Sequence, residues 1–488
     1  MAASSSKKKA GTKVTKVKKG AVSYYGAGDT PPSNSKPNDR PAGVHFATAS
    51  FAVLLCFACG VLSPPLLHLR DELLSSQSVS AASGSSSDRH SLSLPQHVPC
   101  TKANLDSFLH SAPVKGLHVV CVESLQVDDD GNEVPLAAER RLETRSSIRL
   151  TFYKGAHAAR LKRRVNVKSN SWEDVKVKLV TGLSLMPETP ILQPWALFSA
   201  MGDRIVGERD KLNNEMNDRT MSSLVSSELL VIAEGGNWIW PGVSEGFRRE
   251  IELAPSTITG NSKNVTIETL SMKPLVLSIS GFLADEECDY IMEKAAPTMK
   301  YSGVSLKDAD KGRPASDWRT SQSTFVAAMG DPILRDIELR TASLTRVPVT
   351  HQEFVQVLRY GVTEKYDAHH DFFDPSSYRS DPGTLQLIEN GKKNRYATVF
   401  WYLTDVARGG ETCFPRHGGA PPPRDFSMCT GLKVKPQKGK VIIFYSLDAS
   451  GEMDPLSLHG ACPVLGKEDI KWAANKWLWN APMSYVPP

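Results

Sequence analysis

The chain has 488 residues and a mass of 53.4 kDa, which allows two or three domains at roughly 100 to 200 residues each. Its hydrophobic fraction of 40%, charged fraction of 23% and mean hydropathy of -0.28 exclude a wholly disordered, fibrous or polytopic membrane protein. The net charge of +5 comes from residues 1–43, which hold nine Lys or Arg and two Asp or Glu. The rest of the chain is nearly neutral, so no nucleic-acid partner is expected.

Three segments of different composition precede the first globular pattern. Residues 1–43 are rich in Lys, Ser, Gly and Pro and are expected to form a disordered basic tail. Residues 44–65 carry no charged side chain and are long enough to cross a bilayer as a helix, and residues 66–99 are expected to be a Ser-rich stalk. Because lysines precede the apolar run, the tail is placed in the cytosol and the rest in the lumen.

This pattern predicts a single-pass type II protein of the endoplasmic reticulum or Golgi membrane, with an uncleaved transmembrane signal anchor. A cleaved signal peptide is the alternative, and it would deliver the body of the chain to the same pathway.

Residues 100–245 are expected to form a small α+β module. Residues 148–152 alternate apolar and polar side chains, as a half-buried strand does. Asn170 followed by Glu173 is a capping-box signature for a short helix that ends near Gly182. With further strands at 195–198 and 229–232, the order of elements resembles a ubiquitin-like β-grasp. No catalytic constellation lies in it, so we expect an accessory role.

Residues 268–488 contain many short apolar runs separated by Gly, Pro and Asp. A helix is expected from Asp285, because apolar residues follow it at helical spacing as far as Ala295. Short strands are expected at residues 354–360, 396–403 and 441–447. The predicted fold is mainly β with flanking helices, a double-stranded β-helix (jelly roll).

The strongest chemical signal is the pair His369 and Asp371. Side chains two apart on a strand point to the same face, so His370 between them points away. A third ligand can come from a distant strand, for which His459 is the candidate and His417 the competitor. Two histidines and one carboxylate form the facial triad of non-haem Fe(II) oxygenases.

A lysine follows the distal histidine at position 471, directly before Trp472. If this lysine lies on an inner strand, its buried ammonium requires an anionic partner. Lys467 is the alternative for this role.

The region from about 275 to 485 resembles the catalytic domain of the prolyl 4-hydroxylases, which depend on iron and 2-oxoglutarate. The matching stretches lie in the same order and at similar spacing, at GFLADEEC 281–288, RTS 319–321, QVLRY 356–360, YDAHHD 366–371, RYATVFWYL 395–403, GGET 409–412, VKPQKG 434–439, SLHGACP 457–463 and KWAANKW 471–477. Two departures are an insertion of two residues between His459 and Lys471, in which Lys467 falls, and His370 in place of an aromatic residue.

The resemblance implies a role for nine residues. His369, Asp371 and His459 would hold Fe(II). Lys471 would pair with the distal carboxylate of 2-oxoglutarate, which Tyr360 and Thr412 would also contact. The side chains expected to line the peptide groove near the metal are Tyr366, Arg395 and Trp477, with Arg319 as readily structural as substrate-binding.

The implied reaction is hydroxylation of proline in a proline-rich or collagen-like peptide, coupled to oxidative decarboxylation of 2-oxoglutarate by O₂, with ascorbate restoring oxidised iron. Alternatives are an oxygenase for lysine or a small molecule, and a catalytically silent peptide-binding module, because the fold alone does not set the substrate. The oligomeric state does not follow from the sequence.

Six cysteines lie outside the apolar segment and allow fifteen pairings. Proximity favours Cys100 with Cys121 and Cys413 with Cys429, and free buried thiols are the alternative. Asn264 begins a glycosylation sequon. The Gly- and Pro-rich loop at residues 414–430 is expected near the active-site mouth, either as a substrate lid or as an inert surface loop.

Overall fold

The computed structural model describes residues 97–127, 145–158, 162–167, 172–187, 195–206, 219–220 and 227–483. The expected basic tail, the apolar segment of residues 44–65 and nearly all of the stalk lie outside the described residues. Within the part of the chain that the structure describes, no helix combines the length and the apolar character needed to cross a membrane. All described residues belong to one compact unit, Leu62–Pro488.

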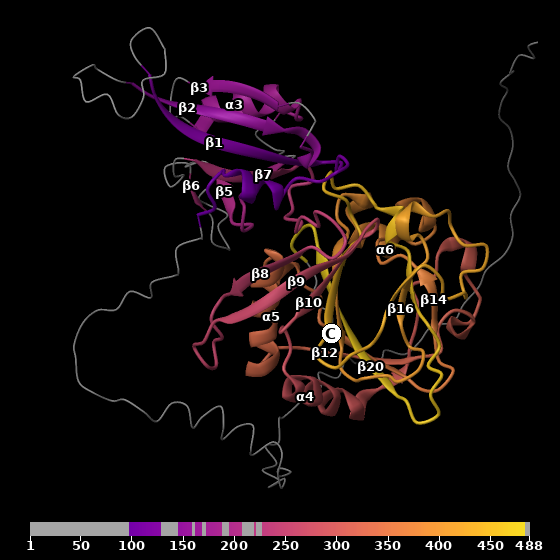
Figure 1. Cartoon of the computed structure of the whole chain (residues 1–488). Coiled ribbons are helices and arrows are strands. Elements are labelled where there is room, and N and C mark those ends of the chain that lie inside the picture. The colour runs from indigo at the N-terminus through magenta and orange to yellow at the C-terminus, as the bar shows by residue number, and fades with distance from the viewer. Residues whose placement is uncertain are drawn as a thin grey trace, which may run out of the picture. The chain divides into compact units, whose positions relative to one another are not determined.

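The N-terminal module is an antiparallel sheet with α3 (Trp172–Leu183) against one face and the short α2 (Lys102–Asp106) before it (Figure 1). In the described residues the strand order is β3-β2-β1-β7-β4-β5-β6, and only the small β5–β6 pair is parallel. The strands are β1 (Leu117–Val127), β2 (Arg145–Tyr153), β3 (Lys162–Val167), β4 (Ala196–Ser199), β5 (Arg204–Val206), β6 (Arg219–Thr220) and β7 (Glu228–Ala233).

The predicted β-grasp topology is wrong. A β-grasp pairs its first and last strands in parallel, whereas β1 and β7 run antiparallel, with Val119 opposite Val231. The α+β composition is as expected, but the direction of a strand pair leaves no trace in an alternating pattern, because the period of 2 is the same for both directions.

Both faces of β1 are buried. Val120 and Val122 pack with α3 side chains in one apolar cluster. Leu117 and Val119, on the opposite face, belong to a second cluster that continues without interruption into the C-terminal domain. The module sheet is therefore packed between its own helix and the domain that follows.

The C-terminal domain consists of a major and a minor sheet that enclose an apolar core. The major sheet has the order β11-β12-β13-β20-β15-β18-β10-β9-β8, and the minor sheet the order β14-β19-β16-β17. The strands of the major sheet are β8 (Arg248–Leu253), β9 (Lys263–Met272), β10 (Leu275–Ser280), β11 (Lys300–Tyr301), β12 (Gln322–Val326), β13 (Val355–Tyr360), β15 (Arg395–Tyr402), β18 (Val441–Tyr445) and β20 (Lys471–Trp479). Those of the minor sheet are β14 (Tyr366–His369), β16 (Thr412–Phe414), β17 (Leu432–Val434) and β19 (His459–Ala461).

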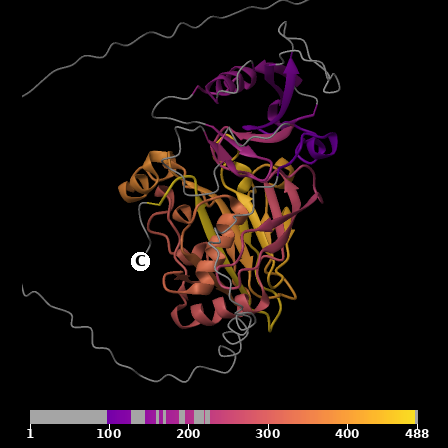
Figure 2. The same cartoon turned by 90° about the vertical axis from the view of Figure 1, so that its left-hand side faces the viewer.

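Residues from both sheets meet in this inner core, among them Tyr402 of β15 and Phe414 of β16. Helices α4 (Asp285–Ala295) and α5 (Pro332–Thr345) lie on the other face of the major sheet (Figures 1 and 2), and their apolar side chains join the cluster on that face. Helix α6 (Pro382–Leu387) precedes β15. The predicted mainly β jelly roll with flanking helices is confirmed. The helix expected from Asp285 is α4, in which Cys288, Ile291 and Ala295 are buried.

Strand β20 illustrates how this sheet separates two environments. Ala473 belongs to the inner core, whereas Ala474 and Leu478 belong to the outer, helix-covered cluster. By the same alternation Lys471 faces inward, and Lys476 faces outward, where its Nζ lies 2.8 Å from Glu338 Oε1 of α5. The two buried lysines of one strand therefore belong to opposite sides of the sheet.

Candidate active site

The three predicted metal ligands converge where β14 and β19 pair. His369 lies directly opposite His459 in the antiparallel ladder, and Asp371 follows two residues after β14 ends. The Nε2 atom of His369 is 3.8 Å from Asp371 Oδ1, and that of His459 is 3.5 Å from Asp371 Oδ2. One ligand atom from each residue lies within 4.8 Å of the other two. This spacing suits a single ion between them.

Hydrogen bonds orient each of these three side chains. The Nδ1 atoms of His369 and His459 lie 2.8 and 2.9 Å from the carbonyl oxygens of Asp367 and Ser457. A carbonyl only accepts, so each Nδ1 carries the proton and each Nε2 keeps a free lone pair. Thr398 Oγ1 on β15 donates to Asp371 Oδ2 at 2.6 Å and fixes the carboxylate. Such outer contacts set the direction and basicity of metal ligands.

Electrostatics prepare these groups for a cation. Burial lowers the pKa of His369, and the neighbouring imidazole of His459 lowers it further. Burial alone would raise the pKa of Asp371, but His459 and His369 overcome this and hold it below its ordinary value. At neutral pH the site therefore offers a neutral imidazole at His369 beside an ionised carboxylate, which are the forms that bind a divalent metal.

A buried cationic slot lies inside the same barrel. Lys471 is fully buried, and its Nζ has no hydrogen-bond partner. The rings of Tyr360, Phe400 and Tyr402 surround this atom, with centroids 5.1, 5.5 and 5.8 Å away. Burial lowers the pKa of Lys471 to about 7. A buried ammonium without an anion is costly, so the slot is suited to a carboxylate.

Tyr360 and Thr412, the two residues expected beside this lysine, are each linked to its surroundings by one contact. Tyr360 lies directly opposite Lys471 in the β13–β20 ladder, and Thr412 Oγ1 accepts a hydrogen bond of 2.7 Å from Tyr402. Lys467, the alternative lysine, is exposed. The residues present thus fit a carboxylate beside Lys471, in the same barrel as the triad.

The three residues expected to line the peptide groove fall into two clusters. Tyr366 stacks on His369 with ring centroids 3.7 Å apart, and the Arg319 guanidinium carbon lies 4.7 Å from the Tyr366 centroid. In the second cluster the Arg395 guanidinium carbon lies 3.6 Å from the ring centroid of Trp477. Arg319 is buried, and its Nε donates to Ser321 Oγ at 2.9 Å, whereas its Nη2 has no hydrogen-bond partner among the described residues.

Glu353 and Thr398 were not singled out in the sequence. Glu353 accepts from Arg395 Nε at 2.6 Å, Arg395 Nη2 at 3.0 Å and Trp479 Nε1 at 2.7 Å. Thr398 is fully buried beside Asp371. The only sequence signal for Thr398 is a polar residue inside the apolar strand 396–403, and Glu353 has none.

The competing histidines lie elsewhere. His370 faces away from the triad, with its Nε2 3.1 Å from the Pro455 carbonyl and its ring stacked on Phe372. His417 Nε2 lies 3.3 Å from Glu245 Oε1 at the surface. Neither belongs to the group that converges on Asp371.

The long loop between β16 and β17 runs beside the triad. The Phe426 carbonyl accepts a 2.8 Å hydrogen bond from the Ala368 amide, next to His369. The predicted Cys413–Cys429 bond is wrong, because Cys429 is bonded to Cys462, whereas the predicted Cys100–Cys121 bond is confirmed. Sequence proximity misled here because the β16–β19 pairing brings Cys462 equally close.

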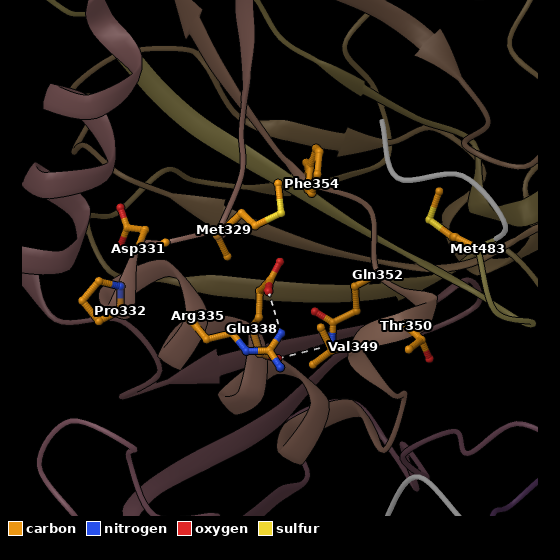
Figure 3. A pocket seen from close by; sticks show the side chains of 12 residues that line it. Met329, Asp331, Pro332, Arg335, Glu338, Val349, Thr350, Gln352, Phe354 and Met483 are labelled. Atoms are coloured by element: carbon orange, nitrogen blue, oxygen red, sulfur yellow. Dashed lines mark hydrogen bonds and ion pairs between the residues drawn. The ribbon is translucent and has the colours of Figure 1, made fainter. Parts of the chain in front are cut away.

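A separate cavity of about 770 Å³ lies at the start of α5 (Figure 3). Arg335 and Glu338 line it and approach to 3.4 Å, and Glu338 also neutralises Lys476 on the outer face of β20. None of its lining residues belongs to the triad or the Lys471 slot. We assign it no part in metal or co-substrate binding.

A jelly roll with a His-Asp-His triad and an internal cationic slot defines the class of iron oxygenases that use a 2-oxo acid. In agreement, residues 355–479 match the family described as the 2OG-Fe(II) oxygenase superfamily. Probable prolyl 4-hydroxylase 9 of Arabidopsis thaliana is 35% identical over 240 residues, which cover 48% of this chain and 79% of the relative. Prolyl 4-hydroxylase 2 of the same plant is 38% identical over 233 residues, which cover 46% and 73%.

The chain belongs to the prolyl 4-hydroxylase family of Fe(II)- and 2-oxoglutarate-dependent oxygenases. Among solved structures, that of the viral collagen prolyl hydroxylase from Paramecium Bursaria Chlorella virus-1 is 25% identical, with a TM-score of 0.29, and the alignment covers 42% of this chain and 95% of the viral one.

Proposed function

We propose that this protein is a peptidyl-proline 4-hydroxylase that couples oxidative decarboxylation of 2-oxoglutarate to hydroxylation of proline in proteins of the secretory pathway. One observation carries the proposal beyond the fold. The fully buried Lys471 ammonium has no hydrogen-bond partner in the same barrel as a His-Asp-His cluster. A buried cation of this kind is best explained by an anionic co-substrate.

In this proposal His369, Asp371 and His459 hold the iron, and Lys471, Tyr360 and Thr412 hold 2-oxoglutarate. When bound, the iron and 2-oxoglutarate supply the oxidation that uses O₂ to place a hydroxyl group on the substrate carbon. The chain supplies the rest. Thr398 and the carbonyls of Asp367 and Ser457 orient the ligands, and the aromatic walls around Lys471 exclude water.

The substrate is proposed to lie over Tyr366 and between the two aromatic clusters. The His369 side chain is 25% exposed, whereas those of Asp371 and His459 are 4% and 8% exposed, so the metal position opens on the side of His369 and Tyr366. Aromatic side chains in a groove suit an extended proline-rich chain, whose rings pack against them. A proline-rich or collagen-like peptide is therefore the proposed substrate class, and the names of the Arabidopsis relatives agree with it.

A luminal location is also proposed, anchored by the apolar segment of residues 44–65. Two disulfides in the described residues favour an oxidising compartment. Asn264 of the sequon is exposed on β9, where an acceptor must be. The endoplasmic reticulum is the compartment that fits both, and ascorbate is the proposed reductant that keeps the iron ferrous.

The test offers the full chain a poly-proline peptide with Fe(II), 2-oxoglutarate and ascorbate, and detects hydroxyproline isomers by mass spectrometry against 4-hydroxyproline standards. Succinate is measured in parallel with a lysine-rich peptide and without peptide. We expect 4-hydroxyproline and peptide-dependent succinate, and neither with His369→Ala or His459→Ala. Hydroxylation of the lysine peptide alone would replace the proline assignment. Peptide binding with no succinate would instead show a silent binding module.

A further inference from the structure

Three cysteine sulfurs gather in and beside the minor sheet. The Sγ atoms of Cys413, Cys429 and Cys462 all lie within 4.8 Å of one another. Cys429 and Cys462 form a disulfide, and Cys413 is a buried free thiol. Cys413 is next in sequence to Thr412 and is close enough to Lys471 to influence its charge. A free thiol close to a disulfide is the arrangement from which thiol–disulfide exchange starts.

The three cysteines differ in how firmly they are held. Cys413 lies in β16 opposite Gly460, and the amide of Cys462 donates to the Glu411 carbonyl just beyond the same pairing, at 2.8 Å. By strand alternation Cys413 and Cys462 are diagonal neighbours on one face of the minor sheet. Cys429 lies in the loop between β16 and β17, and it is the least buried of the three. Cys429, in the loop, can therefore form a disulfide with either of the two cysteines held by the sheet, Cys413 or Cys462.

Backbone contacts place Cys413 between these elements. Cys413 lies opposite Gly460, the residue after His459, in the β16–β19 ladder, and opposite Lys433 in the β16–β17 ladder. Burial raises the pKa of Cys413, so the thiol form dominates and exchange is slow at rest. The free thiol is thus stored beside the disulfide rather than consumed.

We propose that Cys413, Cys429 and Cys462 form a thiol–disulfide exchange site, at which the loop between β16 and β17 moves its covalent anchor from Cys462 to Cys413. The Cys413 thiolate attacks the Cys429 sulfur, the Cys413–Cys429 bond forms and the Cys429–Cys462 bond breaks. Cys462 leaves as a thiolate and takes up the proton that Cys413 lost. One disulfide and one thiol exist before and after, so the step needs no external oxidant or reductant.

The two isomers are close in chain entropy. The existing bond joins residues 33 positions apart, and the alternative bond joins residues 16 apart in the sequence. A twofold difference in loop length changes the closure entropy only slightly. Small changes in the surroundings, such as filling of the neighbouring slot, can therefore select one isomer.

The exchange would change the surroundings of the metal site. In the observed isomer a disulfide joins the loop to Cys462, which directly follows β19, the strand that begins with His459. The Phe426 carbonyl accepts a hydrogen bond from the Ala368 amide beside His369. In the alternative isomer the loop is tied only within its own hairpin, β16–β17. We expect this isomer to release Phe426 from Ala368 and to open the side of the barrel that His369 faces.

The test maps disulfides in the full chain by trapping thiols with N-ethylmaleimide and digesting without reduction. Cys462→Ser leaves Cys429 only one neighbour, so we expect a Cys413–Cys429 crosslink in that variant. Cys413→Ser should retain Cys429–Cys462, and Cys100–Cys121 is the internal control for oxidation. Alkylation of both Cys413 and Cys429 in Cys462→Ser, with the control bond intact, would overturn the proposal.

A second measurement on the wild-type chain does not depend on folding of a variant. After incubation in glutathione buffers of varied redox ratio, we expect both the Cys429–Cys462 and the Cys413–Cys429 peptides. Detection of the Cys429–Cys462 peptide alone at every ratio refutes exchange. Neither readout requires catalytic activity, so failure here is distinguishable from failure of the proposed function.

Discussion

Arg395 lies over Trp477, with its guanidinium carbon 3.6 Å from the ring centroid, and Glu353 holds it there through both carboxylate oxygens. The burial that would lower the pKa of Arg395 is outweighed by Glu353, so its charge is secure. The largely buried pair is therefore held in one position with its positive charge intact.

Glu353→Gln is expected to weaken peptide binding without affecting the co-substrate. The change removes one charged partner of Arg395, and hydrogen bonds to charged groups contribute about 1.5–3 kcal/mol. We expect the KM for peptide to rise about tenfold or more, since 1.4 kcal/mol is a factor of ten, while the KM for 2-oxoglutarate stays constant. The exposed Glu468→Gln is the matched control. Equal KM values for peptide in both variants would contradict the role of Glu353.

Thr398→Val is expected to lower metal affinity. It removes the 2.6 Å hydrogen bond to Asp371 Oδ2 while keeping the side-chain shape. Loss of such an outer contact weakens metal binding about 10- to 100-fold. Titration with Mn(II) by calorimetry measures this without turnover. Thr398→Ser keeps the hydroxyl and should bind as the wild type does, so equal loss in both variants would point to packing instead.

Lys471→Met is expected to raise the KM for 2-oxoglutarate by about 10- to 100-fold, from the loss of a charge-assisted hydrogen bond. The same variant should melt at a higher temperature without ligand, because it removes a buried, unpaired ammonium. Lys467→Ala, at an exposed position, should change neither value. Equal effects of the two substitutions on the KM would show that Lys471 is not the lysine that specifically binds the carboxylate of 2-oxoglutarate.

The pH dependence of co-substrate binding follows from the same lysine. Burial holds its pKa at about 7 when no anion lies beside it, and the ammonium form binds the carboxylate. Binding must therefore take up a proton above pH 7, and the apparent Kd for 2-oxoglutarate should rise from pH 7 to pH 9. The free energy of unfolding of the unliganded protein changes with pH in the opposite sense. The unfolded lysine keeps its proton up to about pH 10.5, so this group makes the unliganded protein more stable as the pH rises from 7 to 10.5. Calorimetry of Lys471→Met should show neither trend.

Gly116→Ala is expected to destabilise the protein far more than Gly236→Ala. Both glycines have φ of 75°, so both pay about 1 kcal/mol for a side chain in the left-handed region. Only at Gly116 does a Cβ meet backbone, 2.2 Å from Ser450 N, whereas nothing lies within 4 Å of it at Gly236. Urea unfolding measures the difference. Equal losses would mean that the module and the loop at Ser450 are not in contact.

Much of the catalytic domain could be predicted because its functional side chains lie on strands, where every second residue points to the same face. His369 and Asp371 share a face, and Lys471 precedes a tryptophan on a strand, so residue type and spacing suffice. The relation of Lys476 to Glu338 could not be predicted, because the same alternation sends Lys476 to a helix distant in sequence. The roles of Glu353 and Cys462 could not be predicted for the same reason. Their partners are set by pairing between strands far apart in the chain, which no local pattern records.

The continuous apolar packing from β1 into the C-terminal domain bears on how this enzyme can be divided. Cutting the polypeptide near residue 245 would leave each fragment with an uncovered apolar surface that water penalises. Each fragment is therefore expected to aggregate or to be unstable when it is produced alone. The module contributes to the same apolar cluster as helices α4 and α5, so it supports the barrel as these helices do.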